Sequence, residues 1–230
     1  LDKNKKKIIN FKANNLHIVN YSSPVNKVMT KEQLLNKIYS LPKLPDAIPY
    51  VTSYYKKNWG FCENYKNVIK IKKNYKKNDK FKVVINSKFK SNGYLNYGEI
   101  FIKGKTKKEI LISTYICHPS MANNEISGPI VTLAISKYFL KLKSYYSLRF
   151  IFVPETIGAI SYINKNLNKM RENIVGGYVL TCIGDNRNYS YLSSKYDNSL
   201  SDIVAYETFK KLKIKFKKYS FLKRGSDERQ

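Results

Sequence analysis

The chain has 230 residues, of which 43% are hydrophobic, so it is long enough for one globular domain with a core and a small insertion. Its formal net charge is +27, but only five of the 43 basic residues are Arg, whereas nucleic-acid surfaces favour Arg because its guanidinium makes bidentate contacts. Lys, Asn, Ile and Tyr are enriched together, which indicates an AT-rich genome and argues against a specific nucleic-acid-binding protein.

The N-terminal part begins with a predicted strand and a predicted helix. Residues 15–22 (NLHIVNYS) have strand-like composition. Thr30 stands three residues before Gln33, which is the spacing of a capping box, and an apolar run follows, so a short helix is expected to start here. Three prolines in residues 41–49 indicate a linker or an edge crossing.

A β-hairpin is predicted around Asn92-Gly93. This dipeptide supplies the positive φ of a type I′ turn and separates two strand-like runs, residues 82–89 and 94–102. We therefore interpret residues 48–106 as a small β-rich insertion.

Beyond residue 106 the pattern changes to units of strand, loop and helix. Three windows of this half contain no Lys and hold strand-like apolar runs, and burial on both faces of a sheet would exclude Lys there. We predict that the three runs are parallel neighbours in one sheet covered by helices. The expected strands are residues 110–117, 148–153 and 176–183, the Lys-free windows are 109–136, 150–164 and 172–194, and the expected helices begin with Ser127 as a cap, begin at about 157, and span 200–212.

Polar residues follow the ends of these three strands. His118 comes after the first strand with Glu125 seven residues further on, Glu155 follows the second strand, and Asp185 follows the third. Ligands of open α/β sheets bind outside the carboxyl ends of the strands. We expect these four side chains to converge within about 10 Å, a span over which one metal ion and its ligands could contact all of them.

Each of these residues also has a structural interpretation. A single His at a strand end is often a hydrogen-bonded structural residue, although imidazole is the commonest protein metal ligand. Asn124 and Glu125 suit a turn and a helix N-terminus, or they point into the same pocket as His118. Glu155 beside apolar walls would have a raised pKa and suit general-base work, or it is an acid at a helix N-terminus. Asp185 is a carboxylate ligand or the acceptor of an Asx turn.

Five motifs occur in order along the chain: YVTSYYKKNWGFC, STYICHPSMANNEISGP, FVPETIG, LTCIGD and RGSDERQ. Together they resemble a bacterial family of aminopeptidase-like proteins, often described as polysaccharide-biosynthesis proteins with an aminopeptidase-like domain. The resemblance covers nearly the whole chain. It implies an α/β fold with the three-layer αβα architecture and mixed sheet of zinc aminopeptidases, and a small inserted β-rich domain.

That family looks like a distant branch of the zinc aminopeptidase superfamily, and the comparison implies roles for single residues. The superfamily's first ligand His matches His118, and its general base falls on Glu155. A shift of one residue would instead make Glu155 a metal ligand. The late Ser-Asp pocket motif matches Ser226-Asp227.

Three ligand positions of the superfamily are neutral in this chain. Its metal-bridging Asp falls on Asn124, its second-metal Glu on Thr156, and a further Asp ligand on Thr181. Two zinc ions would have too little negative charge to share, so a single rearranged zinc ion is expected. Its expected ligands are His118, Glu125 and Asp185, and the residues expected to contact substrate are Asn124, Arg187, Asp227 and Glu228.

The leading hypothesis is a metal-dependent hydrolase of peptide or other amide bonds, with a small peptide-like or amino-sugar substrate in surface-polysaccharide biosynthesis. The alternative is a catalytically degenerate aminopeptidase fold that binds a ligand without turnover. The three cysteines show no C-x-x-C spacing and fit a reduced cytoplasm. No apolar run reaches the roughly 18 residues of a membrane span, and oligomeric state is left open.

The domain organisation follows from the same resemblance. Residues 1–47 are expected to begin the aminopeptidase-like domain, residues 48–106 to form the insertion, and residues 107–230 to continue the domain. Because the chain starts at Leu1 and stops inside a charged turn, we expect a fragment of a longer protein. Family members continue past this point into a segment with another His and a winged-helix-like end, so this piece alone is expected to be inactive.

Overall fold

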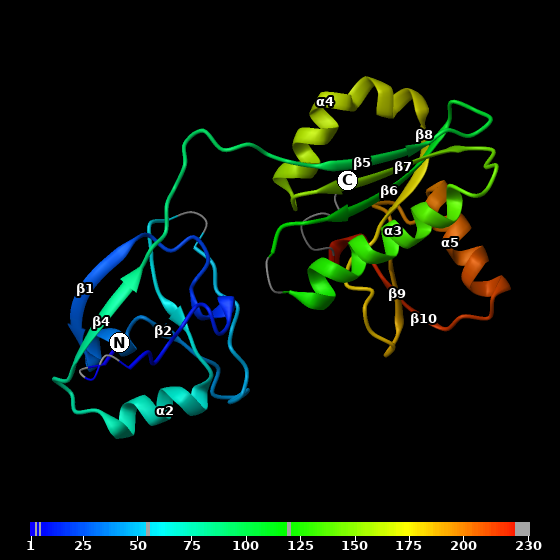
Figure 1. Cartoon of the computed structure of the whole chain (residues 1–230). Coiled ribbons are helices and arrows are strands. Elements are labelled where there is room, and N and C mark those ends of the chain that lie inside the picture. Colours follow the sequence, from blue (N-terminus) through cyan, green and yellow to red (C-terminus); the bar gives the residue numbers. More distant parts are fainter. Residues whose placement is uncertain (3, 5, 54–55, 119–120, 224–230) are drawn as a thin grey trace. The chain divides into compact units, whose positions relative to one another are not determined.

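The computed structural model describes residues 1–223 apart from residues 3, 5, 54, 55, 119 and 120. It divides the chain into two compact units, Leu1–Gly93 and Tyr94–Gln230, each with its own core (Figure 1). The domain limits expected at residues 47 and 106 stay predictions.

The first unit consists of two small sheets and short helices around one apolar core. β1 pairs antiparallel with β4, and β2 pairs parallel with β3. Phe81, Val83 and Ile85 alternate along β4 into the core, where they meet Met29 and Leu34. The elements of this unit are η1 (Asn15–His17), β1 (Val25–Thr30), α1 (Lys31–Leu35), β2 (Ile38–Tyr39), β3 (Phe61–Cys62), α2 (Tyr65–Asn74) and β4 (Lys80–Ile85).

One local prediction for this unit is confirmed and another is wrong. The capping box forms, because the Thr30 side chain accepts from the Gln33 N–H and the Gln33 side chain accepts from the Thr30 N–H. The strand expected at residues 15–22 does not form. The Asn14 side chain accepts from the Leu16 N–H and starts a short 3₁₀ helix, an example of a polar side chain competing with sheet pairing.

The predicted hairpin around Asn92-Gly93 is also wrong. β4 pairs with β1, whereas β5 (Gly98–Ile102) pairs with β7 (Ser147–Val153) of the second unit. No described glycine has a positive φ, so Gly93 does not adopt the conformation of a type I′ turn. Burial in two different cores therefore decides the pairing, and the local turn signal does not.

The second unit is built on a four-stranded mixed sheet with the order β5-β7-β6-β8. β6 lies between β7 and β8 and is parallel to both, which confirms the three predicted parallel neighbours, while β5 is antiparallel to β7. The remaining elements are β6 (Glu109–Tyr115), the π-helical turn η2 (Ala122–Ile126), α3 (Ser127–Phe139), α4 (Ile157–Asn173), β8 (Ile174–Val179), β9 (Tyr189–Leu192), α5 (Leu200–Lys211), β10 (Phe216–Tyr219) and η3 (Phe221–Lys223).

Helices cover both faces of this sheet, which confirms the expected three-layer architecture (Figure 1). On one face α4 packs Ala159 and Tyr162 against Ile151 and Val153. On the other face α3 packs Ile135 and Phe139 against the opposite side of β7, and α5 contacts β8. Every residue of β7 is buried, whereas every residue of β8 is half-buried. The expected burial on both faces of the sheet therefore holds more fully for β7 than for β8.

A buried carboxylate ties α5 to the loop after β9. Asp202 is fully buried, and its two oxygens accept hydrogen bonds from Tyr191 OH, from the N–H and Oγ of Ser194, and from the N–H and Oγ of Ser199. Burial opposes ionisation, but the hydrogen bonds from Ser194 and Ser199 outweigh it and lower the pKa of Asp202.

Replacing Asp202 by asparagine is expected to lower the free energy of unfolding by about 3 kcal/mol at neutral pH, because an amide nitrogen then faces N–H and O–H donors. Because the pKa of Asp202 is lower in the folded state, the ionised carboxylate stabilises the fold fully above the unfolded pKa of about 4. This contribution is lost as the pH falls from that value through the folded pKa. Urea denaturation of both proteins at neutral and acid pH measures the difference, which should shrink in acid. The exposed Asp197, replaced in the same way, should change stability little; an equal loss in both variants would contradict the prediction.

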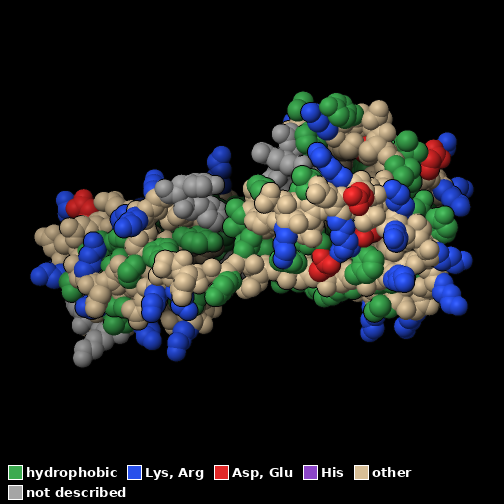
Figure 2. Space-filling view, turned by 90° about the horizontal axis from the view of Figure 1, so that it is seen from above, with side chains coloured by type: hydrophobic (Ala, Val, Ile, Leu, Met, Phe, Trp, Pro, Cys, Tyr) green, Lys and Arg blue, Asp and Glu red, His purple; other side chains and the backbone are tan. Residues whose placement is uncertain are grey.

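The Lys and Arg side chains that carry the positive charge lie between side chains of other kinds on the surface (Figure 2). In the view of Figure 2, Lys and Arg are scattered over the visible face. Weak binding to DNA that disappears near physiological salt therefore stays the expectation. Among the helices formed by the described residues, none has the length and apolarity that a membrane crossing requires.

Candidate functional site

Two loops at the carboxyl ends of parallel strands carry the candidate site. β6 ends at Tyr115, three residues before His118, and β7 ends at Val153, two residues before Glu155. Parallel neighbouring strands end at the same edge of a sheet, so these residues are brought together. The turn η2, which leads into α3, supplies Glu125 to the same place.

The imidazole of His118 lies between two carboxylates. Its Nδ1 is 2.6 Å from Glu125 Oε1, and its Nε2 is 3.4 Å from Glu155 Oε2. The side chains of His118 and Glu125 are 15% and 6% exposed, whereas that of Glu155 is 27% exposed. The Nε2 side of the ring is therefore the side with more access to solvent.

Glu125 is held from both of its oxygens. Oε1 contacts His118, and Oε2 accepts the backbone N–H of Cys117 at 2.8 Å. Of the two interpretations that the sequence left open, the structure shows the one in which Glu125 turns inward, toward His118. The expected cap at Ser127 is wrong. Its Oγ instead donates to the Asn123 carbonyl and accepts the Ile183 N–H, so it ties the turn to the loop after β8.

Cys117 is a member of the site that sequence reasoning missed. Its Sγ lies 3.1 Å from His118 Nδ1 and accepts the Glu155 N–H at 3.3 Å. Cys117, His118 and Glu125 each offer one possible ligand atom, and these atoms lie within 4.8 Å of one another. The position next to His118 was the only available signal, because strand alternation no longer sets side-chain direction beyond the end of β6.

The donors suit zinc in type, since zinc accepts sulfur, imidazole nitrogen and carboxylate oxygen. Bond lengths of about 2.0–2.1 Å in a tetrahedral site place nitrogen and oxygen ligands roughly 3.3 Å apart. The distance of 3.4 Å between His118 Nε2 and Glu155 Oε2 matches that spacing. The 2.6 Å between His118 Nδ1 and Glu125 Oε1 is shorter and is that of a charge-assisted hydrogen bond. The residues present thus fit an ion on the Nε2 side of the ring.

A neutral hydrogen-bonded cluster occupies the position where the superfamily resemblance implied further anionic ligands. Asn124 donates to Tyr115 OH at 3.2 Å and to Cys182 Sγ at 3.4 Å, and Tyr115 OH also hydrogen-bonds Thr181 Oγ1. Thr156 and Cys182 have positive φ angles of 58° and 52°. Such strained backbone is uncommon for these residue types and often accompanies functional sites.

Asp185 and Arg187 form a pair beside this cluster. Arg187 donates to both oxygens of Asp185 at 3.0 and 3.1 Å, and Asn123 donates to Asp185 Oδ2 at 3.2 Å. The hydrogen bonds from Arg187 lower the pKa of Asp185 to about 2. The structure thus joins Asp185 to Asn123, which precedes Asn124 and Glu125 in η2, and its role as a metal ligand stays a prediction. Asp227 and Glu228, both expected to contact substrate, lie outside the described residues.

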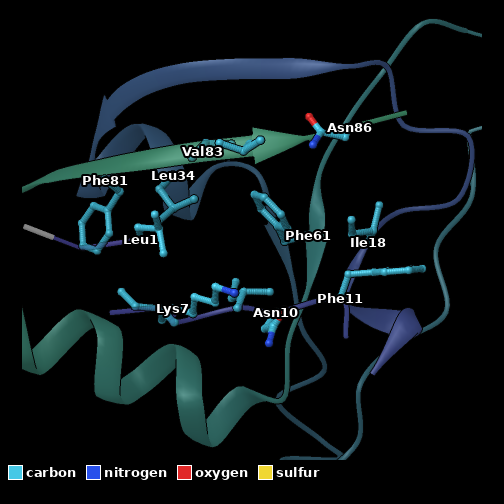
Figure 3. Close-up of a pocket in the computed structure, with 13 residues that line it drawn as sticks. Leu1, Lys7, Asn10, Phe11, Ile18, Leu34, Phe61, Phe81, Val83 and Asn86 are labelled. Carbon is cyan, nitrogen blue, oxygen red and sulfur yellow. The ribbon is translucent and has the colours of Figure 1, made fainter. Parts of the chain in front are cut away.

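A mainly apolar cavity lies in the first unit. Its volume is about 330 Å³, and its lining is mainly apolar, with Leu34, Phe61, Phe81 and Val83 among the side chains (Figure 3). Its polar residues are Lys7, Asn10 and Asn86, and it includes neither a carboxylate nor a histidine. The histidine and carboxylates of the candidate site lie instead at the sheet edge of the second unit.

Comparison with known sequences identifies a family and a relative. The sequence model of a family described as "Domain of unknown function (DUF4910)" matches residues 12–230. A protein of Clostridium acetobutylicum named "Putative polysaccharide biosynthesis protein with aminopeptidase-like domain" is 41% identical over 224 residues. The aligned region covers 97% of this chain and 50% of that protein.

Two solved structures are similar. A crystal structure described as a "putative peptidase" from Clostridium acetobutylicum has a TM-score of 0.92 and 40% identity, and the match covers 100% of this chain and 53% of that one. A zinc aminopeptidase from Bacillus subtilis has a TM-score of 0.58 and 13% identity, covering 87% of this chain and 53% of that one. The second likeness shows the fold alone, and it confirms the architecture expected from the five motifs. The chain spans about half the length of the relatives that it matches.

Proposed function

Because this chain belongs to the DUF4910 family, a domain of unknown function with an aminopeptidase-like fold, we propose that it carries the site of a metal-dependent hydrolase of peptide or other amide bonds. The substrate class is a small peptide-like or amino-sugar compound. The name of the 41% identical relative supports a place in polysaccharide biosynthesis. Since the chain spans half of its relatives, the activity proposed is that of the whole protein.

One observation carries the proposal. A carboxylate only accepts hydrogen bonds, so the contact between Glu125 and His118 Nδ1 places a proton on Nδ1. Nε2, the other ring nitrogen, then faces Glu155 Oε2 across 3.4 Å. An imidazole nitrogen and a carboxylate oxygen at that spacing suit two ligands of one tetrahedral zinc ion, which supports the proposal.

The residues then have separate tasks. When bound at His118, zinc supplies polarisation of the scissile carbonyl and acidification of water. Glu155 takes the proton from the attacking water and returns it to the leaving nitrogen, as its partly exposed position beside His118 allows. Asn124 and Arg187 are proposed to bind polar groups of the substrate, and Asp185 to complete the charge of the site. We also propose a cytoplasmic location, on the spacing of the cysteines.

Zinc binding tests the proposal directly. Zinc-equilibrated whole protein should retain about one ion per chain after gel filtration, and the His118→Ala variant should retain none, as measured by elemental analysis. His17→Ala is the matched control, because His17 is the other histidine and contacts Cys62 O and Glu63 in the first unit. Whole protein that holds no zinc at saturation would remove the hydrolase proposal.

The neutral cluster favours a second candidate, a binding module without turnover. Asn124 and Thr181 stand at positions where the resemblance implied anionic metal ligands, and both hydrogen-bond Tyr115 OH. Such groups donate and accept hydrogen bonds to an amine or acid ligand without activating water. Protein that binds zinc and substrate-like amides but hydrolyses none of them would support this candidate.

A further inference from the structure

The turn η2 places a carboxylate behind His118, and the geometry points to a role for it that differs from metal ligation. We propose that Glu125 is a positioning residue, which holds His118 in the tautomer with hydrogen on Nδ1 and so directs the Nε2 lone pair toward Glu155. The consequence for metal binding rests on the proposed function. The tautomer itself does not, because the contacts within the protein determine it.

The first step is that Glu125 is fixed. It is 7% exposed, its Oε2 is occupied by the Cys117 N–H at 2.8 Å, and its Oε1 is 2.6 Å from His118 Nδ1. An ionised carboxylate has no proton to donate, so the hydrogen of this short contact belongs to the imidazole. A hydrogen bond from one ring nitrogen determines which nitrogen is left to bind a metal.

The second step is that this contact does not have the spacing of a ligand pair. Nitrogen and oxygen ligands of one tetrahedral zinc lie roughly 3.3 Å apart, which is 0.7 Å more than the 2.6 Å found here. Binding an ion between Glu125 and Nδ1 would break this hydrogen bond and pull the carboxylate away from Cys117. On the Nε2 side no such rearrangement is needed, because the spacing to Glu155 is already 3.4 Å.

The third step is that the fold holds the turn in place. The Ser127 N–H bonds the Ala122 carbonyl, five residues back, in the π-helical pattern, and Ser127 Oγ anchors the turn to Ile183. Gly128 lets the start of α3 approach β6 and the end of β8 closely. A Cβ there would lie 2.3 Å from the Leu180 carbonyl oxygen and 2.4 Å from Thr114 Oγ1. π-helical turns are rare and are frequent at functional sites.

The tautomer can be measured directly, because the chain has only two histidines. In long-range proton–nitrogen NMR spectra of ¹⁵N-labelled metal-free protein, recorded with rising pH until the ring signals stop changing, His118 should show hydrogen on Nδ1. Glu125→Ala should shift it toward the tautomer with hydrogen on Nε2. Glu125→Gln should shift it in the same direction, because its one amide oxygen accepts the Cys117 N–H and its NH2 then faces Nδ1 as a donor. His17 is an internal control whose signals should stay unchanged in both variants and so report a folded first unit.

Zinc titration of the same proteins separates the two proposals. A positioning role predicts an affinity about 10- to 100-fold weaker in Glu125→Ala and in Glu125→Gln, together with the change of tautomer, whereas removal of a direct ligand would abolish retention of the ion. Hydrogen on Nε2 of His118 in the wild-type protein would overturn the inference, whether or not zinc binds. Hydrogen on Nδ1 in a protein that binds no zinc would uphold the tautomer and overturn the proposed hydrolase.

Discussion

Replacing Glu155 by glutamine is expected to lower amide hydrolysis by the whole protein about 10²- to 10⁴-fold, which is the usual contribution of a general base. Glutamine keeps the size of the side chain but accepts no proton from water. If Glu155 acts as the base and is not a ligand, a role that its 3.4 Å distance from His118 Nε2 also allows, the zinc content should stay at about one per chain. Hydrolysis of aminoacyl amides and elemental analysis on the same samples measure the two quantities.

The two measurements also distinguish the two alignments of Glu155. If the variant loses zinc together with activity, Glu155 is a ligand, as the alignment shifted by one residue implies. If activity and zinc are both retained, Glu155 has no role in the reaction. Glu207→Gln, at an exposed position of α5, is the matched control and should leave both quantities unchanged.

Replacing Arg149 by alanine is expected to destabilise the second unit by about 3–5 kcal/mol, the cost of leaving a buried charge without its partner. Arg149 is 4% exposed and binds Glu109, itself 3% exposed, through two hydrogen bonds of 2.5 and 2.8 Å. It also binds Glu99 at 2.6 Å, and Tyr162 donates to the same Glu99. The hydrogen bonds that Arg149 donates to Glu109 raise the pKa of Arg149, so the charge stays on the guanidinium.

Urea denaturation measures this effect, and two further variants sharpen it. Arg171→Ala, an exposed arginine at the end of α4, should change the free energy of unfolding by less than about 0.5 kcal/mol. The double variant Arg149→Met with Glu109→Met should recover much of the stability lost in Arg149→Ala, because no charge is then left buried. A loss in Arg149→Ala as small as that in Arg171→Ala would show that the buried network does not stabilise the fold.

The parallel pairing of β6, β7 and β8 could be predicted because the exclusion of Lys appears in all three of these strands. Lys is excluded wherever a strand is covered on both faces, and helix-length segments between parallel strands permit only a crossover connection. β6, β7 and β8 are parallel neighbours for this reason. The start of α1 could be predicted because a capping box is a local arrangement of side chain and backbone.

The wrong predictions at Asn92-Gly93 and at residues 15–22 have different causes, which are pairing with distant strands in the first case and a local side-chain contact in the second. Asn92-Gly93 favours a tight turn, but β4 and β5 find better partners in β1 and β7. Residues 15–22 have strand composition, but the side chain of Asn14 begins a 3₁₀ turn and leaves isolated bridges at Ile18 and Asn20.

For the site, placement at strand ends was sufficient to bring His118 and Glu155 together, since parallel strands end at one edge. The contact of Glu125 with His118 depends on a π-helical turn, which has no periodic signature in sequence. Cys117 depends on the course of the backbone after β6, and the alternation of a strand does not extend to it.

The π-helical turn also makes the site sensitive to chain length. An α-helix advances by about 100° for each residue, so deleting one residue between Met121 and Ser127 would rotate the turn relative to α3 by that angle. With α3 held by the contact of Gly128 with Leu180, the carboxylate of Glu125 would swing off the axis through the imidazole of His118. Two chains with identical site residues but turns that differ by one residue would then orient this histidine differently.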